Sequence, residues 1–199
     1  AGLHYKDILV YVAIRSFYNV KDKYCYPSYQ TIAKRAGVGA RFVSESIKRL
    51  EAAGFIDIWK VGKGRVTHYY KFSEQERYQR VPYSLLEDME LTVYEKSMLL
   101  LIAEYCDNDL VCSRTITEIA ELSGQTYRII DRQLKALILK GYIVEELIED
   151  SASKTINKVM KLTNKISWLK NMNVTGQAVE KPGVDIDAIL AMASKSFRR

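Results

Sequence analysis

The sequence contains few of the residues that catalytic and metal sites use most. It has two histidines, His4 and His68, among 199 residues. The two are far apart in the sequence, neither is supported by a cluster of ligands, and neither lies in a nucleophile motif. The glycine motifs of phosphate and dinucleotide sites are also absent from the sequence. We therefore expect a protein that is not an enzyme and that uses neither a metal ion nor another cofactor.

Long apolar runs and paired cysteines are lacking too. The longest apolar run without a tyrosine, Met98–Ala103, is far below the ~20 residues of a membrane span and is short even for a signal-peptide core. Cys25, Cys106 and Cys112 cannot all pair, and reduced thiols are the simplest interpretation. With 48% hydrophobic and 27% charged residues, the chain is typical of a globular protein. We expect it in the cytoplasm, with no membrane partner.

Positive charge is in excess and unevenly distributed. The formal net charge is +6. Residues 1–80 hold 15 Lys and Arg against 7 Asp and Glu, whereas residues 81–163 hold 9 against 14. The first segment is therefore net +8, the second is net −5, and residues 164–199 are net +3. This division predicts two domains with different roles, the first with an anionic partner.

One segment of the sequence occurs twice. Ser28–Ile56 aligns with Thr115–Ile143 at an offset of 87 residues without a gap. Identical residues occupy the pairs Ile32/Ile119, Ala33/Ala120, Gly37/Gly124, Arg41/Arg128, Lys48/Lys135, Leu50/Leu137, Gly54/Gly141 and Ile56/Ile143. We interpret this repeat as one structural unit used twice.

Local rules predict a helix-turn-helix in each unit. In the first, a helix over Tyr29–Arg35 follows a capping Ser28, and Gly37 allows the left-handed turn that ends it. A second helix is expected over about Ala40–Ala53, with Gly54 after its last turn. The apolar residues of this second helix share one face: Val43, Ile47 and Leu50.

Strand-like segments follow each second helix, and an apolar helix precedes each pair. In the first unit, residues 55–59 and 66–72 are rich in β-branched and aromatic residues around a glycine-rich tip. Residues 142–163 repeat this pattern with a polar tip at 150–154. The preceding helices are expected over residues 8–18 and 93–105. Tyrosine is abundant at 14 residues, and strand packing explains most of those near the first hairpin.

The expected fold is mainly α-helical with small β-hairpin wings, in class α+β. It comprises two winged helix-turn-helix domains in tandem, residues 1–80 and residues 81–163. Residues 164–199 form a linker and a short amphipathic C-terminal helix over about 185–197, with Asp185 as a cap.

Over residues 5–163 the sequence resembles tandem winged-helix DNA-binding proteins, and its first unit resembles the helix-turn-helix of phage and plasmid replication initiators. The residues that carry the second resemblance are Tyr26, Pro27, Ser28, Ile32, Ala33, Gly37, Leu50, Gly54, Phe55 and Ile56. The sequence departs from the pattern at Gly39–Phe42, where family members often have Ser-Arg-Arg or Ser-Arg-Thr.

This resemblance implies a sequence-specific double-stranded DNA-binding protein that acts in origin binding and replication initiation of a plasmid or phage. Two alternatives stay open: a transcriptional regulator of a mobile element, and a tandem winged-helix subunit that binds other proteins.

The second helix of the first unit carries the main candidate DNA contacts. A helix of this kind enters the major groove, and its N-terminal half meets the base edges. The candidates are Ala40, Arg41, Phe42, Ser44, Glu45 and Lys48. Arg41 suits a bidentate contact to guanine, and Ala40 or Phe42 suits a thymine methyl group. The alternative is a solvated face on which Glu45 pairs with Lys48 or Arg49.

The first hairpin and the first short helix add further candidates. Lys60, Lys63, Arg65 and His68 surround the hairpin glycines, which suits phosphate or minor-groove contact; solubilising charge is the alternative. Ser28, Lys34 and Arg35 border the first short helix. Lys34 and Arg35 are equally consistent with phosphate contacts and with surface charge.

The second unit offers a similar helix in acidic surroundings. Its candidates are Thr126, Tyr127, Arg128, Arg132 and Lys135. Asp131 lies on the same face, and residues 145–150 are strongly acidic, which costs affinity for phosphates. Either this helix contacts DNA, or its domain pairs instead with a second copy or a replication partner protein. The C-terminal helix either docks on its own protein or is another surface for a partner.

Overall fold

The computed structural model describes residues 2–63, 66–73, 81, 83–149 and 156–166. These residues form seven helices and five strands, arranged as two small antiparallel sheets beside the helices. The α+β class is therefore confirmed. The predicted C-terminal helix, the hairpin tip at 150–154 and Arg65 lie outside the described residues.

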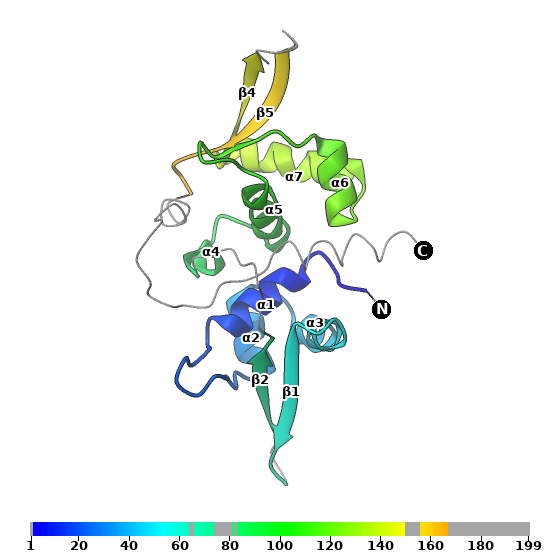
Figure 1. Ribbon diagram of the computed structural model, residues 1–199, viewed down its shortest axis with the longest axis vertical. Helices are drawn as coiled ribbons and strands as arrows, with labels where there is room; N and C mark the ends of the chain where they lie inside the picture. The colour runs from blue at the N-terminus through cyan, green and yellow to red at the C-terminus, as the bar shows by residue number, and fades with distance from the viewer. Residues whose placement is uncertain (1, 64–65, 74–80, 82, 150–155, 167–199) are drawn as a thin grey trace.

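The first half of the chain, shown in blue and cyan in Figure 1, consists of three helices and a hairpin. Its elements are α1 (Asp7–Arg15), α2 (Tyr29–Ala36), α3 (Ala40–Ala52), β1 (Ile56–Val61) and β2 (Thr67–Phe72). The predicted helix over 8–18 ends early because the chain turns after α1. The N–H groups of residues 17 and 18 each bond a carbonyl three residues back.

The second half repeats this order and adds a one-turn helix and a short strand. Its elements are α4 (Ser84–Glu87), α5 (Val93–Glu104), β3 (Val111–Cys112), α6 (Ile116–Ser123), α7 (Tyr127–Leu139), β4 (Ile143–Glu149) and β5 (Ile156–Leu162). The bounds of α6 and α7 lie 87 residues after those of α2 and α3. The repeat predicted from the sequence is therefore a repeat of secondary structure.

Both helix turns form by the same local chemistry. The Ser28 hydroxyl accepts a hydrogen bond from the backbone N–H of Thr31 at 3.1 Å and caps α2. Thr115 caps α6 in the same way. Gly37 and Gly124 end these helices with φ of 72° and 63°, a left-handed conformation that favours glycine.

The sheets extend the repeat beyond the segment that the sequence alignment covers. β1 pairs antiparallel with β2, and β4 pairs antiparallel with β5. Cys25 forms a bridge with Tyr70 of β2, and Cys112 of β3 pairs with Met160 of β5. Cys25 and Cys112 are also 87 residues apart, and both are buried. In each half, a third segment therefore pairs with the second strand of the hairpin.

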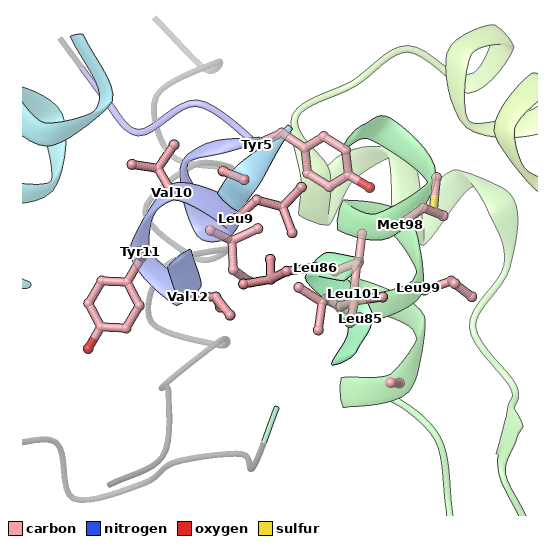
Figure 2. Packing of buried hydrophobic residues seen from close by; sticks show 14 of the residues in the cluster. Tyr5, Leu9, Val10, Tyr11, Val12, Leu85, Leu86, Met98, Leu99 and Leu101 are labelled. Atoms are coloured by element: carbon pink, nitrogen blue, oxygen red, sulfur yellow. The ribbon is translucent and has the colours of Figure 1, made fainter. Parts of the chain in front are cut away.

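Helices α1 and α5 join the two halves. α1 contacts α5, and the buried apolar side chains of both halves form one cluster. Figure 2 shows Leu9 and Val12 of α1 pointing toward Leu85, Leu86 and Leu101 of the second half. The two hairpins extend away from the packed helices α1 and α5 in opposite directions (Figure 1).

In the described part of the chain, no helix is long and apolar enough to cross a membrane. The same residues contain no group of three or more His, Cys, Asp or Glu side chains placed to hold a metal ion.

Candidate nucleic-acid interface

Helix α3 has one buried face and one exposed, charged face. Val43, Ile47 and Leu50 are at most 1% exposed, which confirms the predicted core face. The side chain of Arg41 is 94% exposed, and Lys48 is exposed on the following turns. Ala40 and Glu45 are exposed and Ser44 is half-buried. α3 therefore presents an open surface that begins in its first turn.

Within α3, the ionic partner of Glu45 is Arg41. The Arg41 guanidinium donates to the Glu45 carboxylate at 3.1 Å. The alternative interpretation of this face paired Glu45 with Lys48 or Arg49. Arg49 donates instead to the buried Asp7 carboxylate of α1. An exposed pair such as Arg41–Glu45 is worth little in water, so Arg41 stays free to exchange partners.

Phe42 lies on a different side of α3 from Arg41. Its half-buried ring meets the His4 ring edge-on, with centroids 5.6 Å apart. The Lys6 ammonium lies 4.6 Å from the centre of the same ring, and the Arg49 guanidinium lies 5.3 Å from it. The pKa of His4 lies below its usual value, and burial is the main cause. Phe42 thus holds the N-terminal segment against α3.

The β1–β2 hairpin contacts the helix-turn-helix through one of its predicted residues, His68. Lys60 and His68 are paired in the antiparallel register. The His68 ring stacks on Tyr29 of α2, with centroids 5.1 Å apart. The pKa of Tyr29 lies above its usual value because burial raises it. A hydrogen bond with Ser44 of α3 acts in the opposite direction but does not outweigh burial. His68, Tyr29 and Ser44 therefore connect the hairpin with both helices of the turn.

Two lysines of the hairpin remain open for an anion. Lys60 and Lys63 are exposed, and no carboxylate among the described residues lies within ion-pair distance of either. Arg65, the third predicted cation here, lies outside the described residues. The hairpin thus adds two exposed cations to those of α3.

The three predicted residues around α2 have different surroundings. The Ser28 hydroxyl is engaged with Thr31 as the helix cap. The Arg35 guanidinium donates to Glu87 of α4 at 2.6 Å. Lys34 is exposed. Ser28 therefore caps α2, Arg35 pairs with α4, and Lys34 is the cation of α2 without an ionic partner among the described residues.

Helix α7 presents the predicted residues of the second half. Thr126 is its N-cap residue and is exposed, and the side chain of Tyr127 is 55% exposed. Arg128 and Arg132 are exposed. The Lys135 ammonium donates to Asp131 at 2.8 Å, and this hydrogen bond raises the pKa of Lys135. The two arginines are therefore the cations of α7 without an ionic partner among the described residues.

The acidic hairpin of the second half is partly neutralised across its strands. Lys158 lies 2.8 Å from the Glu145 carboxylate, and Lys161 lies 3.3 Å from that of Glu146. The sequence alone showed only the run of acids on β4, because its cationic partners lie on the other strand. The same hairpin exposes apolar side chains, with Leu147 at 73%.

Sequence reasoning did not identify Tyr29 or Asp7 as residues that support the site. Asp7 has no local signal, since its partner Arg49 lies 42 residues away. Tyr29 had one usable signal: it directly follows the capping Ser28, which places its side chain in the first turn of α2.

The arrangement of α1, α2 and α3 agrees with a known domain type. Residues 1–56 match the family model of a helix-turn-helix domain. This helix-turn-helix domain includes all the candidate residues of α2 and α3 and ends at the first residue of β1. It supports DNA binding by the first half of the chain. No curated protein matches the chain.

Proposed function

We propose that the protein binds double-stranded DNA in a sequence-specific manner through the first half of the chain. Helix α3 lies in the major groove, and the β1–β2 hairpin acts as a wing on the phosphates or in the minor groove. The second half is a second winged helix of the same design. The protein acts by binding, without catalysis.

The observation that carries this proposal is the exposed cationic surface of the helix-turn-helix domain. Arg41 projects from the first turn of α3, where side chains reach base edges. Lys34, Lys48, Lys60 and Lys63 are also exposed, in a half of the chain with net charge +8. We leave Phe42 out of the contact set because its ring packs on His4.

The biological role that we propose is origin binding in replication initiation of a plasmid or phage. Its support is the resemblance of residues 26–56 to the helix-turn-helix of such initiators. Transcriptional regulation of a mobile element uses the same contacts. The position of the bound site separates the two roles: an origin in the first case, a promoter in the second.

A second candidate function, protein binding, concerns the second half alone. Leu139 at the end of α7 is 89% exposed, and Leu147 on β4 is 73% exposed. Two further apolar residues of β4, Val144 and Ile148, are 40% and 41% exposed, and contiguous exposed apolar patches mark protein contact sites. In this candidate the second half pairs with another copy or with a replication partner, while the first half binds DNA.

Selection of bound fragments from a random duplex library tests the proposal. We expect enrichment of one defined motif. A motif with two separated parts would indicate that α3 and α7 both read bases, and a motif with one part would indicate α3 alone. Recovery of fragments without any shared motif would contradict sequence-specific binding.

A further inference from the structure

The outer face of the first hairpin carries a layer of aromatic side chains. Cys25 and Tyr70 exchange backbone hydrogen bonds of 3.0 and 2.8 Å, so residues 24–26 lie as a third strand beside β2. Cys25 and Tyr70 are both buried. Side chains alternate along a strand, so their neighbours point to the opposite, outer face. These neighbours are Tyr24, Tyr26 and Tyr69, and Trp59 lies opposite Tyr69 in the register.

The four rings contact one another. Trp59 and Tyr69 are stacked, with centroids 5.4 Å apart and planes at 16°. Tyr24 meets both rings edge-on, at 5.6 and 5.5 Å. Tyr26 lies 5.5 Å from Tyr69. We call these four residues the aromatic platform.

Two rings of the aromatic platform, those of Tyr26 and Trp59, are exposed to solvent. Tyr26 is 62% exposed and Trp59 is 39% exposed. Large aromatic side chains contribute most to stability when they are buried, so these two contribute less to the core than their size allows.

The fold does not require aromatic residues at these positions. The second half has the same three strand positions, and Glu146 pairs with Val159 where Trp59 pairs with Tyr69. Val111 and Ser113 stand at the places of Tyr24 and Tyr26, 87 residues on. The same hairpin therefore forms without any aromatic ring on this face, which points to a function for the rings in the first half.

The charge around the platform favours a polyanion. Lys71 shares the outer face with Tyr69 and is exposed, and Lys21 and Lys23 precede Tyr24 and are exposed. Two acids lie near them: Asp57 opposite Lys71 in the register, and Asp22, which accepts a hydrogen bond from Asn19. The surroundings are net positive within a half of the chain that is net +8.

We propose that the aromatic platform binds single-stranded DNA by stacking unpaired bases on Tyr26 and Trp59. A sheet face with open rings beside cations is the surface on which single strands bind with little sequence preference, because every base has a face to stack. This site is separate from α3: the rings lie on the outer face of the hairpin, and Tyr29 and His68 lie on the face toward α2 and α3. The inference does not depend on duplex binding by α3.

Tryptophan fluorescence provides a direct test on the full chain. The chain has two tryptophans, so a Trp168→Phe variant leaves Trp59 as the only one. We expect oligothymidylate to quench its emission, and an abasic strand of the same length to quench it far less. Equal quenching by both strands would reduce the contact to phosphate binding and overturn the proposal, as would no quenching.

Matched variants test the two rings. Trp59→Ala and Tyr26→Ala should each raise the Kd for labelled oligothymidylate by roughly 5- to 140-fold, the range measured for loss of one stacked base. Tyr94→Ala is the control: this ring is 42% exposed and lies on α5, outside the platform. Equal affinity of all three variants would contradict the proposal.

Two further arms separate the outcomes. Duplex affinity measured on the same samples distinguishes the two proposals, since a failed platform leaves duplex binding intact and a failed α3 site leaves the quenching by oligothymidylate intact. Oligouridylate tests the contribution of the sugar. Quenching by oligothymidylate and oligouridylate alike supports base stacking, whereas quenching by oligouridylate alone would overturn the assignment to DNA.

Discussion

Arg49 of α3 donates two hydrogen bonds, of 2.8 and 2.7 Å, to the carboxylate of Asp7 at the start of α1. The side chain of Asp7 is fully buried and that of Arg49 is 17% exposed. The hydrogen bond to Asp7 raises the pKa of Arg49. This buried ion pair joins α3 to the start of α1.

Removal of the Arg49 charge should destabilise the protein strongly. Arg49→Met leaves the buried Asp7 carboxylate without its cation, which costs about 3–5 kcal/mol. Urea denaturation measures the change. Arg41→Ala is the control, because an exposed side chain contributes within about 0.5 kcal/mol. A loss no larger than that of the control would show that Asp7 finds another partner.

Arg41→Ala should weaken binding to the preferred duplex by about 1–3 kcal/mol and relax the preference at one or two positions. The physical reason is the loss of a bidentate contact to a base edge. Competition binding with single-base variants of the selected site measures both effects. Uniform loss on every sequence would instead assign Arg41 to the phosphates.

The wing lysines should contribute salt-dependent affinity. Replacement of both Lys60 and Lys63 by alanine removes two cations that have no carboxylate partner among the described residues. The slope of log K against log salt should fall by roughly 2, at about 0.9 per lost phosphate contact. Titrations at several salt concentrations give the slope. An unchanged slope would remove the hairpin from the interface.

Combined replacement of Arg128, Arg132 and Lys135 by alanine should separate the two roles proposed for the second half. If α7 touches DNA, affinity falls while the sedimentation coefficient is unchanged. Affinity that survives the triple change would rule out base reading by α7 and leave protein binding as the role of this half. We expect the first outcome, because Arg128 stands at the position of Arg41 in the repeat.

Glu95 should make the stability of the second half sensitive to acid. Burial acts to raise its pKa, but hydrogen bonds from Lys140 and Thr92 outweigh burial, and the pKa lies below its usual 4.5. A lowered pKa in the folded state means that the stabilisation is present above pH 4.5 and is lost as the pH falls through the folded value. Glu95→Gln should therefore flatten the decline in denaturation midpoint between pH 5 and 3. An identical decline in both proteins would contradict this role.

The helix-turn-helix units could be predicted from the sequence because local chemistry determines them. Glycine fixes where α2 and α6 end, and the spacing of Val43, Ile47 and Leu50 fixes the buried face of α3. These predictions need no information from distant residues.

The remaining features depend on contacts between distant segments. Arg35 pairs with Glu87 across 52 residues, and no local pattern marks the pair. The platform ring of Trp59 meets Tyr24 only because residues 24–26 lie beside β2. Predicting that tyrosines near the hairpin mostly pack between strands was correct for Tyr70, which is buried. It did not distinguish Tyr69 on the outer face.

The packing of α1 on α5 has a consequence for spacing on DNA. Because one core holds both halves, neither helix turn can rotate independently to follow a shifted target. Where both halves contact one duplex, the protein therefore fixes the distance and the rotation between the two half-sites. Each inserted base pair turns one half-site about 35° around the helix axis, so a single insertion between half-sites breaks the match that a flexible tether would tolerate.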